Sequence, residues 1–196
     1  PGLTCLTGFF KNGHEIRLIR QDGSIVHRWP LKFSGLFRNL EHIKPASDIP
    51  TGEWDVSVHG SECLPDGSVI FNFIYKGGAR VDRCGKVLWA IPQMTHHSVT
   101  RSMDGGYWIP SARRIERASA YEKLEVPYLE DTILKVSADG AVRQELSVVE
   151  ILAKNNLEGY IYRRGLSGDL THLNDIQELD AGPPASFPQF AAGDLV

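Results

Sequence analysis

One short phrase occurs three times in this chain, and it constrains the fold more than any other feature. In each copy, two runs of alternating apolar residues flank a turn that contains glycine. The copies span residues 17–29, 79–89 and 133–143, with turn glycines Gly23, Gly85 and Gly140. Each copy predicts a β-hairpin, because a glycine in the turn can adopt a positive φ without steric cost.

The spacing of these hairpins predicts a repeat architecture. Their turn glycines are 62 and 55 residues apart, a period typical of supersecondary repeats. A second hairpin type precedes two of the copies, with turns at Asp66-Gly67 and Asp104-Gly105. One repeat therefore holds two hairpins, or four antiparallel strands. We predict an all-β fold, a β-propeller made of four-stranded antiparallel blades.

The repeat divides the chain into consecutive segments. Residues 1–58 hold N-terminal strands and a loop, 59–91 and 97–146 form two blades, 147–171 form a helix and loop, and 172–196 begin the next blade. The second blade carries an inserted loop over 113–131. Propellers close with about four to eight blades, so only about half of one is present. We expect the remaining blades in missing chain; closure by a second copy, as a homodimer, is the alternative.

The segment after the second blade, residues 147–171, begins with a sequence pattern typical of a helix start. Ser147 and Glu150 have the spacing of a capping box, in which each residue satisfies a backbone donor of the other. We predict a short helix over Val149, Ile151 and Leu152, followed by an irregular loop that carries Tyr160 and Arg163.

The three cysteines are Cys5, Cys63 and Cys84, without a CxxC spacing. They are too few for a disulfide framework and unsuited to a zinc site. We interpret them as buried thiols, and a Cys63–Cys84 bridge within one blade is the alternative.

Charge and hydropathy exclude some classes of function. The net charge is −3, which argues against nucleic acid as the main partner, because phosphate binding needs a concentrated basic surface. The adjacent arginine pairs Arg113-Arg114 and Arg163-Arg164 are interpreted as solvated edges in the first instance. No run of about 18 apolar residues occurs, so the sequence predicts no membrane span.

Histidines share a register in the two predicted blades. His59 lies eight residues before Gly67, and His97 lies eight residues before Gly105. Both would enter the first strand of a blade at the same level. That strand is the innermost one in a propeller, so we expect the two side chains to face one central pocket.

A third histidine, His172, extends the pattern to the next segment. With Gly182 as the turn, Asn174 holds the eight-residue position, and His172 shares its side of the strand. His96 lies beside His97, and Arg113 or Arg114 follows the next predicted strand. Histidines converging with an arginine indicate a catalytic or ligand site, because arginine binds oxyanions such as sulfate and phosphate well.

Other chemistries find less support. Histidines assisted by Asp55 or Asp175 could bind a metal, but no tight ligand spacing occurs. The chain contains no Walker A, GxGxxG, Gly-x-Ser-x-Gly or His-Glu-x-x-His motif. We therefore predict neither a metal nor a cofactor.

Taken together, these phrases resemble the bacterial arylsulfotransferase-like family over most of the chain. The resembling segments are 2–4 with 16–29, His59-Gly60 through Gly67, His96-His97 through Gly105, 131–140, and 171–175. The resemblance implies a six-bladed propeller that is periplasmic or otherwise extracytoplasmic, with a signal or membrane anchor in a missing N-terminal segment. It also implies sulfuryl transfer between phenols without a nucleotide donor.

The resemblance also assigns roles to the histidines. By position, His172 would be the nucleophile that becomes transiently sulfated. His59, His97 or His96, and Arg113 or Arg114 would hold the sulfate oxygens. Asn174 or Asp175 would orient the ring of His172. The substrate would be a small phenol or aryl sulfate.

A second class of function stays open at this point. Propellers serve as interaction platforms as readily as enzymes, so the fold does not decide between them. The alternative to an enzyme is a non-catalytic propeller that binds a ligand or a partner protein.

Overall fold

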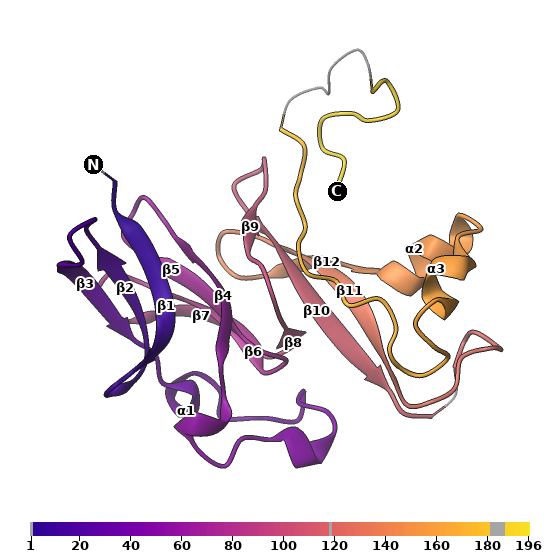
Figure 1. The fold of residues 1–196 in the computed structure, drawn as a ribbon, viewed down its shortest axis with the longest axis horizontal. Coiled ribbons are helices and arrows are strands. Elements are labelled where there is room, and N and C mark those ends of the chain that lie inside the picture. The colour runs from indigo at the N-terminus through magenta and orange to yellow at the C-terminus, as the bar shows by residue number, and fades with distance from the viewer. Residues whose placement is uncertain (1, 118, 181–186) are drawn as a thin grey trace. The chain divides into compact units, whose positions relative to one another are not determined.

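The computed structural model describes residues 2–117, 119–180 and 187–196. The chain is mostly β-sheet with few helices, and it divides into two compact units, Pro1–His96 and His97–Val196 (Figure 1). Among the described residues, no helix has the length and apolar character needed to cross a membrane. The prediction of a β-rich chain is confirmed, whereas a closed propeller of four-stranded blades stays a prediction.

The glycine turns form as the sequence predicts. The five turn glycines have φ between 80° and 89°: Gly23, Gly67, Gly85, Gly105 and Gly140. In the three copies of the repeated phrase, the strand before the turn has an irregular register, at Leu18/Ile19, Arg80/Val81 and Lys135/Val136. A left-handed glycine beside a bulge is the usual geometry of a three-residue hairpin loop.

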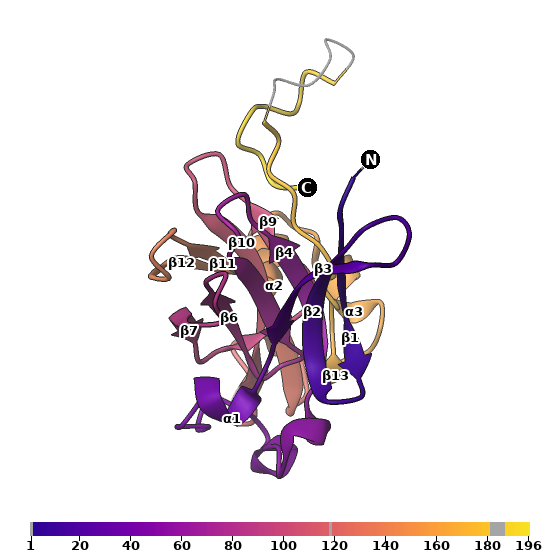
Figure 2. The ribbon, with the colours of Figure 1, turned by 90° about the vertical axis from the view of Figure 1, so that its left-hand side faces the viewer.

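The first unit contains two antiparallel sheets. A three-stranded meander, seen clearly in Figure 2, consists of β1 (Thr4–Phe10), β2 (Gly13–Ile19) and β3 (Ile25–Pro30). A four-stranded sheet consists, in order, of β4 (Val58–Cys63), β5 (Val69–Phe73), β6 (Gly77–Val81) and β7 (Val87–Ile91). The second sheet covers nearly the residues of the predicted blade, 59–91. A further short strand, β8 (Met94–Thr95), ends the unit.

The connection between these two sheets, without clear periodicity in the sequence, holds three short helical turns. These are α1 (Phe33–Leu36), η1 (Ala46–Asp48) and η2 (Glu53–Asp55). Glu53 of η2 accepts hydrogen bonds from the backbone N–H groups of Phe33 and Ser34 at the start of α1. Its carboxylate thereby satisfies donors that a helix leaves open.

A disulfide joins the two sheets of the first unit. Cys5 on β1 pairs with Cys63 on β4, 58 residues away, and Cys84 is free and exposed. The interpretation as buried thiols and the alternative Cys63–Cys84 bridge were therefore wrong. Beside the disulfide, the hydroxyl oxygens of Thr7 and Ser61 lie 2.6 Å apart, which adds a polar contact between the same two strands.

The sheet of the second unit is built on one long hairpin. β10 (Tyr107–Ile115) pairs with β11 (Tyr128–Val136) along its whole length, and β12 (Val142–Ser147) pairs with β11 on the other side. β9 (Thr100–Arg101) pairs with the start of β10. β13 (Gly168–Asp169) lies parallel to the first residues of β11, beyond the end of β12.

The long hairpin shortens the insertion that the sequence suggests. The predicted loop over 113–131 becomes a connection over 116–127, because Arg113 and Arg114 pair with Glu130 and Leu129 inside the strands. Pairing between neighbouring strands extends both strands beyond the segment with clear alternation.

Two helices follow the sheet (Figure 1). They are α2 (Val148–Lys154) and α3 (Glu158–Tyr162), which pack together over a small apolar core that includes Val149 and Ile161. The Ser147 hydroxyl accepts a hydrogen bond from the backbone N–H of Glu150, as a capping box requires. The Glu150 carboxylate pairs with Lys154 at 2.5 Å, so the helix prediction is confirmed with half of the box in place.

The last segment differs from the predicted start of a blade. Residues 172–177 form no regular strand, and Gly182 lies outside the described residues. The chain end 193–196 pairs with this segment instead: Glu178 bridges Leu195, and Gln177 exchanges two backbone hydrogen bonds with Val196.

Candidate functional site

The candidate site lies in the second unit, where the segment 169–178 crosses one face of the sheet. Asp131 on β11 fixes the segment: one carboxylate oxygen accepts from the Thr171 hydroxyl at 2.6 Å and from the Leu173 backbone N–H at 2.8 Å. Asp131 is 1% exposed, so both hydrogen bonds are shielded from water. Because the two bonds flank His172, they determine where that histidine lies.

The far end of the segment is held in the same way. Glu178 accepts from the Trp108 indole N–H at 2.8 Å and from the Met103 backbone N–H at 3.0 Å. Lys135 lies 4.3 Å from the centroid of the Trp108 ring and 3.9 Å from Glu178. Carboxylates at both ends therefore attach an irregular segment to a regular sheet.

The strand register places Asp169 at the edge of this face. Leu129 on β11 is paired with Arg114 on β10 and with Asp169 on β13. Directly paired residues project to the same face, so Arg114 and Asp169 share one face of the sheet. Two residues of parallel pairing therefore determine the face of the sheet to which the Asp169 side chain projects.

His172 is oriented through its ring. Its Nδ1 makes a hydrogen bond to Asp169, and the side chain is about one-third exposed (38%). A carboxylate only accepts, so Nδ1 donates and Nε2 remains for a ligand. The sequence pointed to Asn174 or Asp175 for this task, but the Asn174 amide donates instead to the His172 carbonyl at 3.2 Å.

His97 contacts His172 edge to face. Their ring centroids are 5.1 Å apart with an interplanar angle of 76°. Both residues have a left-handed backbone, with φ of 50° for His97 and 55° for His172. Left-handed non-glycine residues persist only where surrounding contacts hold them, and they are frequent at functional sites.

Asp175 connects the segment with the stretch after His97. It accepts a hydrogen bond from the Thr100 hydroxyl at 3.4 Å. Burial opposes its ionisation, but hydrogen bonds from Ser98 and Gln177 outweigh that effect and lower the pKa of Asp175 below its usual value. An ionised Asp175 therefore ties the two histidine-bearing stretches of this unit together.

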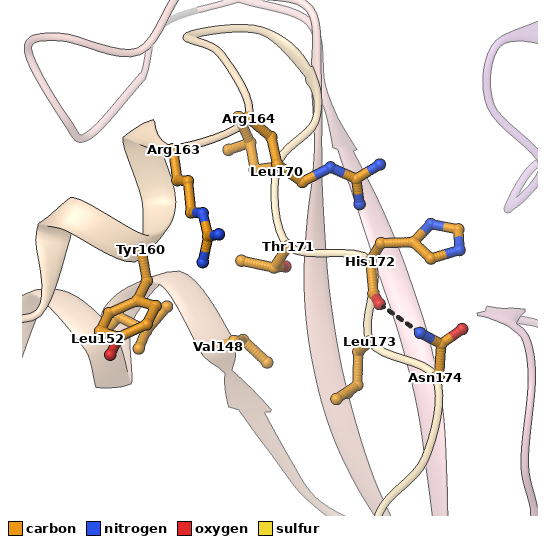
Figure 3. Close-up of a pocket in the computed structure, with 10 residues that line it drawn as sticks. All are labelled: Val148, Leu152, Tyr160, Arg163, Arg164, Leu170, Thr171, His172, Leu173 and Asn174. Atoms are coloured by element: carbon orange, nitrogen blue, oxygen red, sulfur yellow. Dashed lines mark hydrogen bonds between the residues drawn. The ribbon is translucent and has the colours of Figure 1, made fainter.

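A pocket of about 580 Å³ opens beside His172 (Figure 3). It is lined by Val148, Leu152, Tyr160, Arg163, Arg164, Leu170, Thr171, His172, Leu173 and Asn174. Five of these side chains offer mostly apolar surface, and two are arginines. Such a mixture suits a ligand that is apolar at one part and anionic at another.

The predicted arginines of β10 have other partners. Arg113 lies 3.3 Å from Glu130 and 3.6 Å from Glu145, and Arg114 lies 3.2 Å from Glu116. The cations of the pocket are instead Arg163 and Arg164. The sequence signal for this pair is the adjacency of the two arginines, which by itself indicates a solvated edge.

Two of the predicted histidines belong to the first unit. His59 is exposed on β4, where the register is irregular, and His96 is fully buried with its ring centroid 4.7 Å from that of Tyr75. The convergence of His59 and His96 with His97 and His172 stays a prediction. The structure brings together His97 and His172 within one unit.

Sequence reasoning missed two residues that position His172, namely Asp131 and Asp169. Asp131 follows the repeated-hairpin pattern as an ordinary strand residue, and Asp169 lies in an irregular loop. An acidic residue three positions before a candidate histidine was the available signal for Asp169.

Comparisons with known proteins assign no family to the chain. No protein-family model matches it, and no curated protein matches it. A solved structure of a protein of unknown function from Bacteroides caccae is similar, with a TM-score of 0.46 and 17% sequence identity over 74% of this chain. The matched region spans 40% of that protein.

Proposed function

We propose that this protein transfers a sulfuryl group from an aryl sulfate ester to a phenol, with His172 as the nucleophile. The observation that carries the proposal is the fixation of the His172 ring by Asp169 at Nδ1, which leaves Nε2 for a substrate. The same histidine lines a pocket with Arg163 and Arg164. A neutral imidazole is a good nucleophile near pH 7, and arginine suits sulfate oxygens.

In the first half-reaction, Nε2 of His172 attacks the sulfur of the ester. An S–N bond forms, and the bond between sulfur and the aryl oxygen breaks with its electron pair leaving on the phenolate. The sulfated imidazole carries a positive charge, which the Asp169 carboxylate beside Nδ1 stabilises. Arg164 extends toward His172 in Figure 3 and would bind the oxygens of the transferring group.

In the second half-reaction, the oxygen of an acceptor phenol attacks the sulfur. An S–O bond forms, the S–N bond breaks, and its electron pair returns to Nε2. The acceptor loses a proton, and the leaving phenolate of the first half gains one. His97, with its ring centroid 5.1 Å from that of His172, is the group that would exchange this proton.

The proposal includes an extracytoplasmic location. Disulfides persist in oxidising compartments and are rare in the cytosol, so Cys5–Cys63 supports a periplasmic or cell-exterior site. The substrates would be small phenols and their sulfate esters.

The test uses full-length protein, 4-nitrophenyl sulfate as donor and excess phenol as acceptor. We expect nitrophenol release and, without acceptor, an intact-mass gain of one sulfuryl group. His172→Gln should abolish both, whereas His27→Gln, the same substitution in the first unit, should abolish neither. Release without a mass gain in the absence of acceptor would contradict the covalent intermediate.

A second variant examines the orientation of the nucleophile. Asp169→Asn should lower kcat/KM by about a hundredfold or more, because the ring loses the carboxylate that stabilises its charged form. The absence of both release and mass gain over a panel of aryl sulfates would favour the non-catalytic binding module.

A further inference from the structure

The pocket beside His172 carries more positive charge than one sulfate ester needs. An aryl sulfate is a monoanion, and one arginine with the histidine site suffices to neutralise it. None of the ten residues that line the pocket is acidic, while two, Arg163 and Arg164, are arginines. In the described part of the chain, no ion pair involving either arginine is present. A second cation without a carboxylate partner favours a second anionic group on the ligand.

The two arginine side chains extend into different parts of the pocket. Figure 3 shows Arg164 extending toward His172, whereas Arg163 extends from the α3 side of the pocket toward Val148 and the side chain of Thr171. Arg163 follows directly after α3, which positions its stem beside Tyr160. Because the guanidinium groups diverge, a single tetrahedral anion at His172 would use Arg164 and leave Arg163 without a role.

The surface between the two arginines is apolar. Leu152 and Val148 come from α2, Tyr160 comes from α3, and Leu170 and Leu173 come from the crossing segment. Such a wall suits an aromatic ring, which tyrosine and leucine side chains contact well. A ring on this wall would place its substituents toward Arg163 at one end and His172 at the other.

We propose that the substrate is an aryl sulfate with a second anionic group, a carboxylate, on its ring, and that Arg163 binds this carboxylate. The inference rests on the proposed function and deepens it by naming the substrate class. Arginine binds carboxylates in a two-point geometry, so the second group would also align the ester oxygen with Nε2 of His172.

The kinetic test compares two donors that differ in one charge, 4-sulfooxybenzoate and its methyl ester, with full-length protein. The wild type should prefer the carboxylate, and Arg163→Met should reduce the ratio of the two kcat/KM values by about tenfold. Arg163→Lys should retain part of the preference. Arg20→Met removes the same charge from an exposed turn of the first unit and should leave the ratio unchanged.

A binding measurement separates this inference from the proposed function. Titration calorimetry with 4-hydroxybenzoate, which cannot donate a sulfuryl group, should show binding that Arg163→Met weakens by about tenfold. Carboxylate binding that depends on Arg163 in a protein without transferase activity would overturn the function and retain only the carboxylate site at Arg163. Transferase activity with an unchanged donor ratio in Arg163→Met would overturn the inference and retain the function.

A third ligand tests the alternative that both arginines bind one doubly charged group. 4-Nitrophenyl phosphate is a dianion on one group, so both arginines could serve it together. If it binds more tightly than 4-sulfooxybenzoate and loses affinity equally in Arg163→Met and Arg164→Met, the two-group substrate is refuted.

Discussion

Both units of the chain contain an apolar core, but different additional interactions complete them. In the first, large apolar side chains such as Phe71 and Phe73 form the core between two sheets, and a disulfide joins the sheets. In the second, the segment with the candidate nucleophile has no regular structure, and the carboxylates of Asp131, Asp175 and Glu178 hold it. The comparison shows that a covalent bond joins regular sheets in the first unit, while a few carboxylates position an irregular segment in the second.

The largest expected effect comes from the apolar core. Phe71 is 0% exposed and packs edge to face on Phe73, so Phe71→Ala should lower the free energy of unfolding by about 3–5 kcal/mol. Chemical denaturation followed by tryptophan fluorescence measures this loss. Phe187→Ala, at an exposed position, should stay within about 0.5 kcal/mol of the wild type. Equal losses of stability in both variants would contradict the assignment of Phe71 to the stabilising core.

The disulfide gives the next largest effect. Cys5→Ser should lower the free energy of unfolding by about 3 kcal/mol, because the unfolded chain regains the freedom of a long loop. Cys63→Ser and the double variant should lose the same amount, since all three remove one bond. Cys84→Ser, at the free cysteine, should not change the unfolding midpoint under the same conditions.

A polar substitution in the second unit should change local order more than global stability. Asp131→Asn weakens two hydrogen bonds that flank His172, at a cost of about 2 kcal/mol. We expect faster amide hydrogen exchange over 170–178, with exchange over β5 unchanged. Thr171→Val, which removes one of the two bonds, should have a smaller effect. Equal acceleration in both units would indicate that the segment is part of the global core.

The smallest effect is a dependence on pH. Hydrogen bonds from the Ser102 hydroxyl and the Gly106 backbone N–H, with Lys135, lower the pKa of Asp104 from 3.8 to about 2. A lowered folded-state pKa gives stability that is present above pH 3.8 and is lost as the pH falls through about 2. Asp104→Asn should flatten the stability curve in that window. If the stability of the wild type and of Asp104→Asn falls identically at low pH, the lowered pKa of Asp104 is contradicted.

Local chemistry explains which features the sequence predicted. The hairpin turns depend on one glycine each, and the start of α2 depends on Ser147, so neighbouring residues suffice to predict them. The Cys5–Cys63 bond depends on two strands that meet across 58 residues. The spacing of cysteines within one hairpin carries no information about that pairing.

In the candidate site too, residues marked by a local pattern were predicted, and residues that depend on long-range contacts were missed. His172 was proposed as a candidate from its phrase, and the structure shows that its ring contacts the ring of His97. The convergence of the predicted histidines from three blades stays a prediction. Asp169 was missed because two residues of parallel pairing leave no periodic pattern. The pocket arginines were missed because their significance depends on the absence of acidic residues around them, which only the three-dimensional arrangement reveals.

The attachment of the crossing segment also determines the order in which the protein matures. Thr171 bonds to Asp131 across 40 residues, and Thr100 bonds to Asp175 across 75 residues, whereas β10 and β11 are joined by a short connection. Closing a longer loop costs more entropy, so we expect the hairpin to form before the segment docks. A chain under synthesis can therefore complete this sheet while His172 is still unplaced, and we expect the arrangement of Asp169, His172 and His97 to be the last feature that the unit acquires.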